Sequence, residues 1–506
     1  MNQYDMDVLV LGGGVAGVAA AVTAARQGLR TLLVENLTSL GGLVTNNIVL
    51  SLGGYEGFGK ELSDRLRAKG LLNENVSPPA VEPEKCKFEL EAMVLQSGCR
   101  LLYNIRACDV VMNGSDIESA VCYSKSGRSE IKARIFIDTT GDADIAVAAG
   151  VPYDVGDAEY MGLNAAHSMC IRMTNVNMAK YRDAAKAWQD AGNASPTSFS
   201  YVGELMDKAV ENGDLPYAIF PGAQLGQIPG TPDEAACVAC NFTGSLYGHC
   251  ADTDDLSRQL VELHQQVQWL EEAYKKYVPG FENSRMSGLS CLPGIRDSRR
   301  IVGEYILSDM DILTAARFED AITRSNVLLN THHPTSGYWG FRHHIHSKEP
   351  IQGAFNLTEP CDKAMHPFCP PEEGTYSVYH NSATYFEVPY RCLVPLKVDN
   401  LLVAGRCISS EFHANGSVRG VPASMATGQA AAIAAKLCIE KGISNRELDG
   451  SLVRQALIDA GVPLDQVPDK FKEAAAKASH EDKELFRLRG DWVGGRQPDG
   501  KIIMHR

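Results

Sequence analysis

The stretch that decides the fold is Asp7-Val8-Leu9-Val10-Leu11-Gly12-Gly13-Gly14-Val15-Ala16-Gly17. Its apolar first part predicts a buried strand, the glycines predict a tight turn, and the Ala- and Val-rich segment that follows predicts a helix up to Arg26. Gly12 permits the sharp turn, Gly14 leaves room for a phosphate group, and Gly17 lets the helix pack close to the strand. This order is typical of a site that binds a dinucleotide pyrophosphate at a helix N-terminus.

An acidic residue follows at the end of a second apolar run. Gly28 is a usual helix-ending residue, Arg30 to Val34 predict a parallel strand, and Glu35 stands at its end. A carboxylate in this place bonds ribose hydroxyls and disfavours a 2′-phosphate. A glycine-rich turn without a ligand would explain the glycines alone, but strand, helix and carboxylate together favour FAD or NAD over NADP.

Length and composition exclude several classes of protein. The chain has 506 residues, of which 44% are hydrophobic and 22% charged, so it is globular and long enough for about three domains or one large discontinuous domain with additions. The net charge of -14 repels phosphate backbones and anionic lipid, so we expect no nucleic-acid partner and no membrane partner. The uncharged stretch from Val8 to Ala25 is interrupted by glycines and follows no basic residue, so it predicts neither a signal peptide nor a membrane span.

Fourteen cysteines are scattered along the chain without the dense spacing of a disulfide framework. They predict reduced thiols and a cytoplasmic location. Cys237, Cys240 and Cys250 form the closest group, for which three interpretations stay open: buried thiols, a redox pair, or a zinc knuckle. We favour buried thiols, because no second CxxC and no thioredoxin-like context accompany them.

Four segments carry a resemblance to a known family. They are Glu35–Thr45 with its paired Gly41 and Gly42, Ile135–Asp144, the returning segment Val388–Arg406, and His413–Ala431. In this order, from about residue 6 to residue 460, they resemble the FAD-dependent oxidoreductases of the succinate dehydrogenase and fumarate reductase flavoprotein type.

The resemblance implies an α/β fold with a discontinuous Rossmann-like FAD-binding domain. Its two parts would be residues 1–152 and 386–445, with an inserted α+β substrate or cap domain at 153–385 and a helical C-terminal extension at 446–506. The FAD would be non-covalent, because no histidine occurs between Gly41 and Asn47, where related proteins attach the flavin. The residues that the resemblance assigns to the cofactor are Gly12, Gly14, Ala16, Gly17, Glu35, Gly41, Gly42, Thr45, Ala107, Gly141, Asp142, Gly405, Arg406, Arg419, Ala423 and Met425.

Pro422 predicts a helix N-terminus just after Arg419. In the resembling enzymes this end points at the flavin N1–C2 edge, where reduction places negative charge that a helix dipole and a guanidinium would stabilise. Arg406 and Arg419 would then lie near the flavin or its phosphates. Ordinary surface ion pairs are the alternative.

The candidate catalytic residues are two arginines and three histidines. Arg296 and Arg299 lie in a segment that resembles one of the family, and arginine fixes an anionic or carbonyl-bearing substrate by bidentate contacts. The alternative is that they tie the cap to the flavin domain. His332, His344 and His413 are the candidates for a general acid or base.

The histidines stand mostly in one group, which also contains His333, His343 and His346. Asn330-Thr-His332 matches a recurring Asp-x-His of the family, with Asn in place of the acid. His344 and His346 would share one face of a strand, but no acidic or Cys ligand accompanies them, so no metal site is predicted.

Three further segments have predicted structures. Leu101–Asn104, Asp109–Met112, Ala120–Tyr123 and Glu130–Ile137 alternate around Asn113-Gly114 and Ser126-Gly127, which predicts an antiparallel meander. Leu256–Tyr277 predicts a scaffold helix that ends at Pro279-Gly280. The polar, helical end beyond Gly450, with Lys470 to Lys483, is either a solvated tail or a homo-oligomer contact.

We therefore expect an enzyme that transfers a hydride between a small organic substrate and N5 of FAD, as a dehydrogenase or oxidase. The alternative is a flavin-dependent C=C reductase. A tRNA-modifying flavoprotein is disfavoured by the net charge of -14, and a regulatory protein that merely keeps FAD is a third class. The electron acceptor or donor and the substrate stay open.

Overall fold

The protein is described here from a computed structural model. It describes residues 5–54, 56–74, 79–192, 201–217, 224–241, 243–327, 329–332, 334–335, 341–342, 344–347, 356–360, 376–380, 385–468, 472, 495–496 and 502–503. No helix among these residues is long and apolar enough to cross a membrane.

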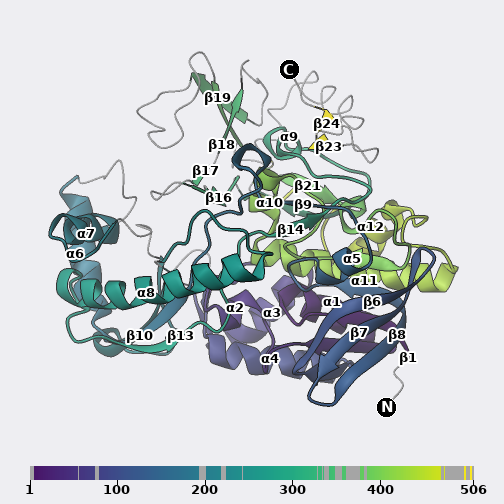
Figure 1. The fold of residues 1–506 in the computed structure, drawn as a ribbon, viewed down its shortest axis with the longest axis horizontal. Helices are drawn as coiled ribbons and strands as arrows, with labels where there is room; N and C mark the ends of the chain where they lie inside the picture. Colours follow the sequence, from purple (N-terminus) through teal and green to yellow (C-terminus); the bar gives the residue numbers. More distant parts are fainter. Residues whose placement is uncertain are drawn as a thin grey trace.

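A parallel sheet forms the centre of the larger lobe (Figure 1). Its parallel strands lie in the order β5-β2-β1-β8-β22. Their bounds are β1 (Asp5–Leu11), β2 (Thr31–Glu35), β5 (Arg100–Tyr103), β8 (Gly127–Asp138) and β22 (Leu401–Val403). The crossover from β1 to β2 is the helix α1 (Val15–Arg26), as the sequence predicts.

The chain returns to this sheet after a long excursion. Leu401 pairs with Phe136 and Val403 with Asp138, so β22 extends the sheet on the far side of β8. The pairing places the segment after β22 at the same edge as the glycine turn after β1. The discontinuous Rossmann-like fold predicted from the sequence is therefore confirmed.

The predicted meander is confirmed for Asp109–Met112 and Ala120–Tyr123, but only in part for Glu130–Ile137, whose residues from Lys132 onward pair parallel with β1. β6 (Ile105–Asn113), β7 (Asp116–Ser124) and the first part of β8 pair antiparallel. The prediction was wrong for Leu101–Asn104, most of which forms β5 and pairs parallel with β2. The helix α4 (Pro83–Gln96) is the reason, because a crossover helix before a strand brings that strand into the sheet in the parallel direction.

Several helices contribute side chains to the main hydrophobic core, which packs on this sheet. Besides α1 and α4 they are α3 (Gly57–Ala68) and α11 (Val421–Lys441). A Cβ on Gly428 of α11 would lie only 2.1 Å from the carbonyl oxygen of Ala16, so α11 and α1 approach backbone to backbone at this point. This approach fixes the start of α11 beside the glycine turn.

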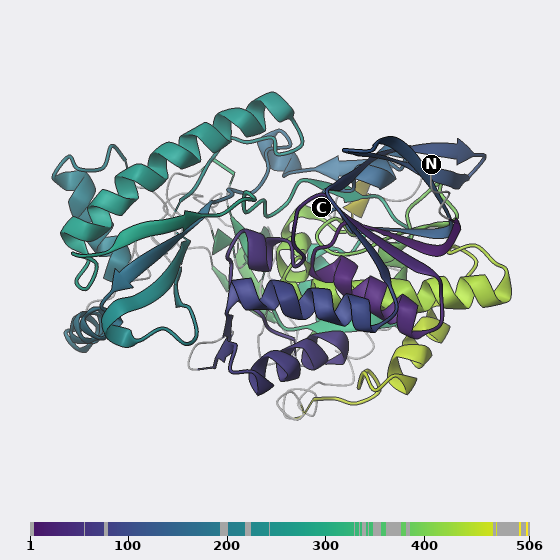
Figure 2. The same cartoon turned by 90° about the horizontal axis from the view of Figure 1, so that it is seen from below.

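A second lobe contains a four-stranded sheet in the order β11-β12-β10-β13 and the helices α6, α7 and α8 (Figures 1 and 2). It has its own core, which includes Val238, Leu270, Tyr274 and Phe281. The bounds are β10 (Cys170–Val176), β11 (Gln224–Gln227), β12 (Ala236–Asn241), β13 (Arg285–Leu289), α6 (Met178–Asp190), α7 (Tyr201–Glu211) and α8 (Thr253–Tyr277).

The helix predicted over Leu256–Tyr277 is confirmed as α8. It begins a few residues earlier than predicted, because the Asp252 carboxylate accepts a hydrogen bond from the backbone N–H of Asp255 and caps the helix. The sheet and helices make this an α+β unit, as expected for the insertion. The domain boundaries expected from the sequence stay predictions.

Two helices contain most of the His413–Ala431 segment near the C-terminal end of the described fold. α10 (Phe412–Val418) stops before Arg419, and α11 starts after its N-cap Gly420, with Pro422 in the first turn as predicted. The helix α12 (Gly450–Asp459) confirms a helical C-terminal region. Most of the 470–483 segment lies outside the described residues.

Short elements complete the described structure. They are α2 (Leu43–Asn46), α5 (Asp144–Ala148), α9 (Asp309–Leu313), β3 (Leu72–Asn73), β4 (Ala80–Val81), β9 (Tyr153–Val155), β14 (Arg299–Ile301), β15 (Ala321–Ser325), β16 (Thr331–His332), β17 (Phe341–Arg342), β18 (His344–Ser347), β19 (Asn356–Pro360), β20 (Tyr376–His380), β21 (Phe386–Pro389), β23 (Gly495–Arg496) and β24 (Ile502–Ile503).

Candidate functional site

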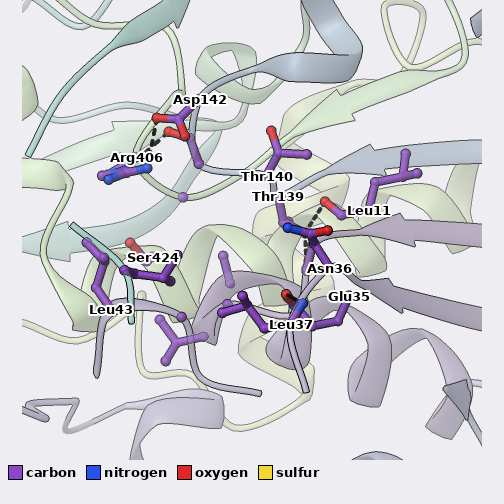
Figure 3. Close-up of a pocket in the computed structure, with 18 of the residues that line it drawn as sticks. Leu11, Glu35, Asn36, Leu37, Leu43, Thr139, Thr140, Asp142, Arg406 and Ser424 are labelled. Atoms are coloured by element: carbon purple, nitrogen blue, oxygen red, sulfur yellow. Dashed lines mark hydrogen bonds and ion pairs between the residues drawn. The ribbon is translucent and has the colours of Figure 1, made fainter. Parts of the chain in front are cut away.

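A cavity of about 390 Å³ lies at the carboxyl ends of β1, β2 and β8 (Figure 3). In open α/β sheets this is the edge at which ligands bind. The lining comes from the glycine turn, the end of β2, the start of β6, the loop after β8, the 292–295 segment, the turn after β22 and the start of α11.

The glycine turn has the geometry that the sequence predicts. Gly12 adopts a φ of +109°, and a Cβ there would lie 2.6 Å from the carbonyl oxygen of Thr139. A Cβ on Gly17 would lie 1.8 Å from the carbonyl oxygen of Gly12, so only glycine lets α1 pack this closely. A Cβ on Gly14 would meet no protein atom within 4 Å, and this residue faces the cavity.

The first turn of α1 also favours an anion. Gly14 is the N-cap and supplies no side-chain cap, and no acidic residue stands in the first turn. The backbone N–H groups at this end and the helix dipole are therefore available to a pyrophosphate. The open space at Gly14 is the cradle that such a group needs.

Glu35 lines the cavity at one side. Its Oε2 accepts a hydrogen bond from the backbone N–H of Gly13 at 2.6 Å, and its Oε1 accepts one from Leu37 at 2.7 Å. Burial raises the pKa of Glu35, and these backbone donors oppose the rise. Each carboxylate oxygen keeps a further lone pair for a ribose hydroxyl.

Arg406 and Asp142 lie on the side of the cavity opposite Glu35, and we call this pair the arginine clamp (Figure 3). Arg406 donates from Nη2 to Oδ1 of Asp142 at 2.9 Å, from Nε to the carbonyl oxygen of Gly141 at 3.2 Å, and from Nη1 to that of Ile295. Ser298 donates to the same Oδ1 of Asp142 at 2.5 Å. The clamp joins the loop after β8, the turn after β22 and the segment that leads into β14.

The start of α11 forms the inner end of the cavity. Val421 and Ser424 line it, and Arg419, just before the helix, lines it as well. Arg419 donates from Nη2 to the carbonyl oxygen of Asn330 at 3.0 Å. Burial lowers the pKa of Arg419 to about 10, so the side chain is cationic at neutral pH.

Most of the residues that the resemblance assigns to the cofactor line this cavity. They are Gly12, Gly14, Ala16, Glu35, Gly41, Gly42, Ala107, Gly141, Asp142, Gly405, Arg406 and Arg419.

Gly17, Thr45, Ala423 and Met425 lie outside the lining. Gly17 packs on the turn, and Thr45 donates to the carbonyl oxygen of Leu40 at 2.6 Å. The two α11 residues are buried, because the helical period turns other residues of α11 toward the cavity.

Some residues that line the cavity were not predicted from the sequence. Arg106 on β6, Thr140 after β8 and the 292–295 segment face the cavity. Arg106 stands beside Ala107, which was assigned, but nothing in the sequence distinguishes an arginine that faces a cavity from one that faces solvent.

The predicted arginines have different surroundings. Arg296 donates from Nη1 to the carbonyl oxygen of Ala166 at 2.5 Å. Arg299 pairs with Asp144, which lines the cavity, and its strand β14 pairs with β9. Arg299 thus also fits the alternative in which arginines tie the insertion to the flavin domain, and its catalytic assignment stays a prediction.

The predicted histidines lie outside the lining of the cavity or outside the description. His413 on α10 makes a hydrogen bond through Nδ1 with Oδ2 of Asp309 at 2.9 Å, and its Nε2 is 3.8 Å from Oδ2 of Asp157. His332 is buried on β16. The side chain of His344 lies outside the described residues, although its backbone forms β18.

A further histidine was missed by sequence reasoning. His167 is buried, and its Nδ1 lies 3.4 Å from Sγ of Cys250. Burial first, and then the charge of Arg296, lower the pKa of His167 to about 3, so the ring is neutral. A single histidine in an apolar segment does not indicate whether its side chain belongs to a functional site or packs in the core.

The cysteine group is divided between two places. Cys237 and Cys240 stand on β12 and project to opposite faces of the strand, since they are three residues apart. Cys250 contacts His167 instead, and all three thiols are free. Among the described residues no group of three or more His, Cys, Asp or Glu side chains is placed to hold a metal ion.

Residues 7–457 match the family model described as FAD dependent oxidoreductase. The chain belongs to this family. Its cofactor is FAD, and the open space at Gly14, the carboxylate of Glu35 and the Asp142–Arg406 clamp fit that cofactor. The narrower succinate dehydrogenase and fumarate reductase type is not confirmed by the match.

Curated relatives are similar to part of the chain. A thiamine thiazole synthase of Methanococcus vannielii is 28% identical over 29% of this chain and 60% of that protein. The tRNA uridine 5-carboxymethylaminomethyl modification enzyme MnmG of Treponema pallidum is 31% identical over 27% of this chain and 25% of that protein. The chain therefore spans less than two thirds of the length of either relative.

Solved structures cover nearly the whole chain at low similarity. A geranylgeranyl bacteriochlorophyll reductase-like protein of Thermoplasma acidophilum is 13% identical with a TM-score of 0.41, over 96% of this chain and all of that one. The p-nitrophenol 4-monooxygenase PnpA of Pseudomonas putida is 10% identical with a TM-score of 0.42, over 97% and 95% of the two chains.

Proposed function

We propose that this FAD-dependent oxidoreductase transfers a hydride between a small organic substrate and N5 of non-covalently bound FAD, in the dehydrogenase or oxidase direction. The observation that carries the proposal is the extent of one cavity, which runs from Glu35 at the ribose end to Arg419 and the start of α11. If the ADP half of FAD binds at Glu35 and Gly14, its flavin would extend toward Arg419. FAD supplies the hydride chemistry when bound.

The chain's own residues would hold the reactants and balance charge. Backbone N–H groups at the start of α1 would favour the negative pyrophosphate, and those at the start of α11 would favour negative charge at the flavin end of the cavity. The 292–295 segment, which leads from the second lobe, lines the cavity and would help to exclude water from the reacting atoms. The proton that accompanies hydride transfer would pass to one of the candidate histidines.

We do not propose for this protein the activities that the names of these partial relatives state. Each matched segment covers less than a third of this chain, and the net charge of -14 disfavours a tRNA substrate. A C=C reductase uses the same geometry in reverse and stays the alternative direction.

The test is an anaerobic screen of the holoenzyme with small metabolites, followed by loss of the oxidised-flavin absorption band. We expect at least one donor to bleach the flavin in a single turnover. If no donor does so, but an enoate re-oxidises dithionite-reduced enzyme, the reductase direction replaces the proposed one.

A further inference from the structure

Arg106 lies at the end of the cavity that contains the carboxylate of Glu35. The backbone N–H of Asn104 donates to the carbonyl oxygen of Leu37 at 3.3 Å, so the first residues of β6 run beside the end of β2. Glu35 and Leu37 line the cavity from β2, and Arg106 lines it from β6. Arg106 therefore faces the part of the cavity in which the adenosine half of FAD would bind.

The guanidinium of Arg106 is not used by the fold that the structure describes. The side chain is exposed, and it donates no hydrogen bond to a described residue and forms no ion pair with one. The lining carboxylate of Asp144 pairs with Arg299, and Glu35 accepts from two backbone N–H groups. The guanidinium of Arg106 is therefore available to a ligand in the cavity.

An adenine ring is best covered by another flat group, and the cavity offers few. No Phe, Tyr or Trp is among the described residues that line it. Arg406 is engaged by three acceptors, and Arg419 lies at the opposite end and donates to Asn330. A guanidinium is planar and stacks on aromatic faces. Among the described lining residues at this end, Arg106 is the one that offers a planar cation.

We propose that the guanidinium of Arg106 stacks on the adenine ring of bound FAD and raises the affinity of the chain for this cofactor. The inference goes beyond the proposed function, because it needs neither a substrate nor a direction of hydride transfer. Two other uses of the side chain compete with it. The guanidinium could pair with the pyrophosphate of FAD, or it could remain in solvent, and the experiment separates all three.

Titration of the full-length apoprotein measures the contribution of Arg106. Quenching of flavin fluorescence gives the Kd of FAD, and calorimetry gives the Kd of ADP, which has the adenine and the pyrophosphate without the flavin. Arg106→Ala should raise both Kd values by the same factor, roughly 5- to 30-fold, because the lost contact lies in the half that the two ligands share. Unchanged Kd values would refute the proposal and leave Arg106 as a solvated side chain.

Two further variants separate stacking from charge. Arg106→Tyr keeps a flat group without the charge, and Arg106→Lys keeps the charge without the plane. Stacking predicts that Arg106→Tyr binds FAD and ADP within about 3-fold of the parent, and that Arg106→Lys binds them nearly as weakly as Arg106→Ala. If Arg106→Lys restores the affinity and Arg106→Tyr does not, the arginine pairs with the pyrophosphate and stacking is refuted.

A matched control and a stability measurement exclude indirect effects. Arg128 is an exposed arginine of β8 that pairs with Glu130 and does not line the cavity, so Arg128→Ala should bind FAD as the parent does. Arg106→Ala should leave the Tm of the apoprotein unchanged and reduce only the added stability that FAD gives. Equal falls in Tm with and without FAD would show that Arg106 serves the fold and would overturn the proposal.

Discussion

The backbone N–H of Gly13 donates to Oε2 of Glu35 at 2.6 Å, and this bond joins the glycine turn after β1 to the end of β2. The same carboxylate accepts from Leu37 through its other oxygen. Glu35 therefore holds the shape of the turn as well as facing the ribose end of the cavity.

Replacement of Glu35 should affect both roles. Glu35→Ala removes the acceptor of two backbone donors, so we expect FAD affinity to fall roughly 10- to 100-fold and the apoprotein to lose thermal stability. Glu35→Gln keeps one acceptor and should lose less stability. Quenching of flavin fluorescence on titration of the apoprotein gives the Kd, and an unchanged Kd in both variants would contradict the assignment of Glu35.

Two glycines of the turn should respond differently to the same substitution. A Cβ at position 14 meets no protein atom within 4 Å, and a valine there would fill the space that the pyrophosphate needs, so Gly14→Val should give folded, colourless protein. A valine at position 17 meets the carbonyl oxygen of Gly12, so Gly17→Val should not fold stably. FAD content after denaturation and circular dichroism melts measure the two outcomes; full FAD occupancy in Gly14→Val would show that the nucleotide lies elsewhere.

The five candidate catalytic residues can be ranked by single-turnover flavin reduction. Alanine at the true acid or base among His332, His344 and His413 should slow reduction by the identified donor on the order of 10²- to 10⁴-fold with FAD still bound. Alanine at Arg296 should mainly raise the donor concentration needed. Arg299→Ala should instead lower thermal stability if its contact with Asp144 only anchors the insertion.

If all five variants reduce at the parental rate, the reacting groups lie elsewhere on the chain.

Two cysteines of the second lobe offer a matched pair. Cys240 is fully buried and Cys237 only in part, so Cys240→Ser should cost about 1–3 kcal/mol of stability and Cys237→Ser less. Neither change should alter FAD binding, because both residues lie on β12 rather than in the lining of the cavity. Elemental analysis that finds about one zinc per chain would contradict the buried-thiol interpretation.

Glu411 predicts a pH dependence of stability. Burial, and next the charge of Asp309, raise the pKa of Glu411 to about 8 from an ordinary value of 4.5. Between these two values the folded chain keeps a proton that the unfolded chain releases, so this group's contribution to the free energy of unfolding falls as pH rises and levels off above about 8.

Glu411→Gln does not titrate, so its stability relative to the parent should rise from pH 5 to pH 8 by at most about 1.4 kcal/mol per unit. Denaturant melts at several pH values measure the difference. Glu61→Gln at the exposed pair with Arg26 is the control, and a parallel pair of pH profiles for Glu411→Gln and the parent would refute the prediction.

The sequence by itself determined the nucleotide-binding half. The turn at Gly12 to Gly17 and the carboxylate of Glu35 act through backbone geometry over short stretches of chain, and such requirements can be read from residue type and spacing. For the same reason Pro422 correctly marked the start of α11.

Only the tertiary structure decided which residues share the cavity. The contact of Arg406 with Asp142 joins residues far apart in sequence, and so does the hydrogen bond from Arg296 to the carbonyl oxygen of Ala166. Leu101–Asn104 alternates like a meander strand, yet most of it forms β5 of the parallel sheet because α4 precedes it. Side-chain direction and strand partner follow from packing between distant segments, which spacing along the chain does not encode.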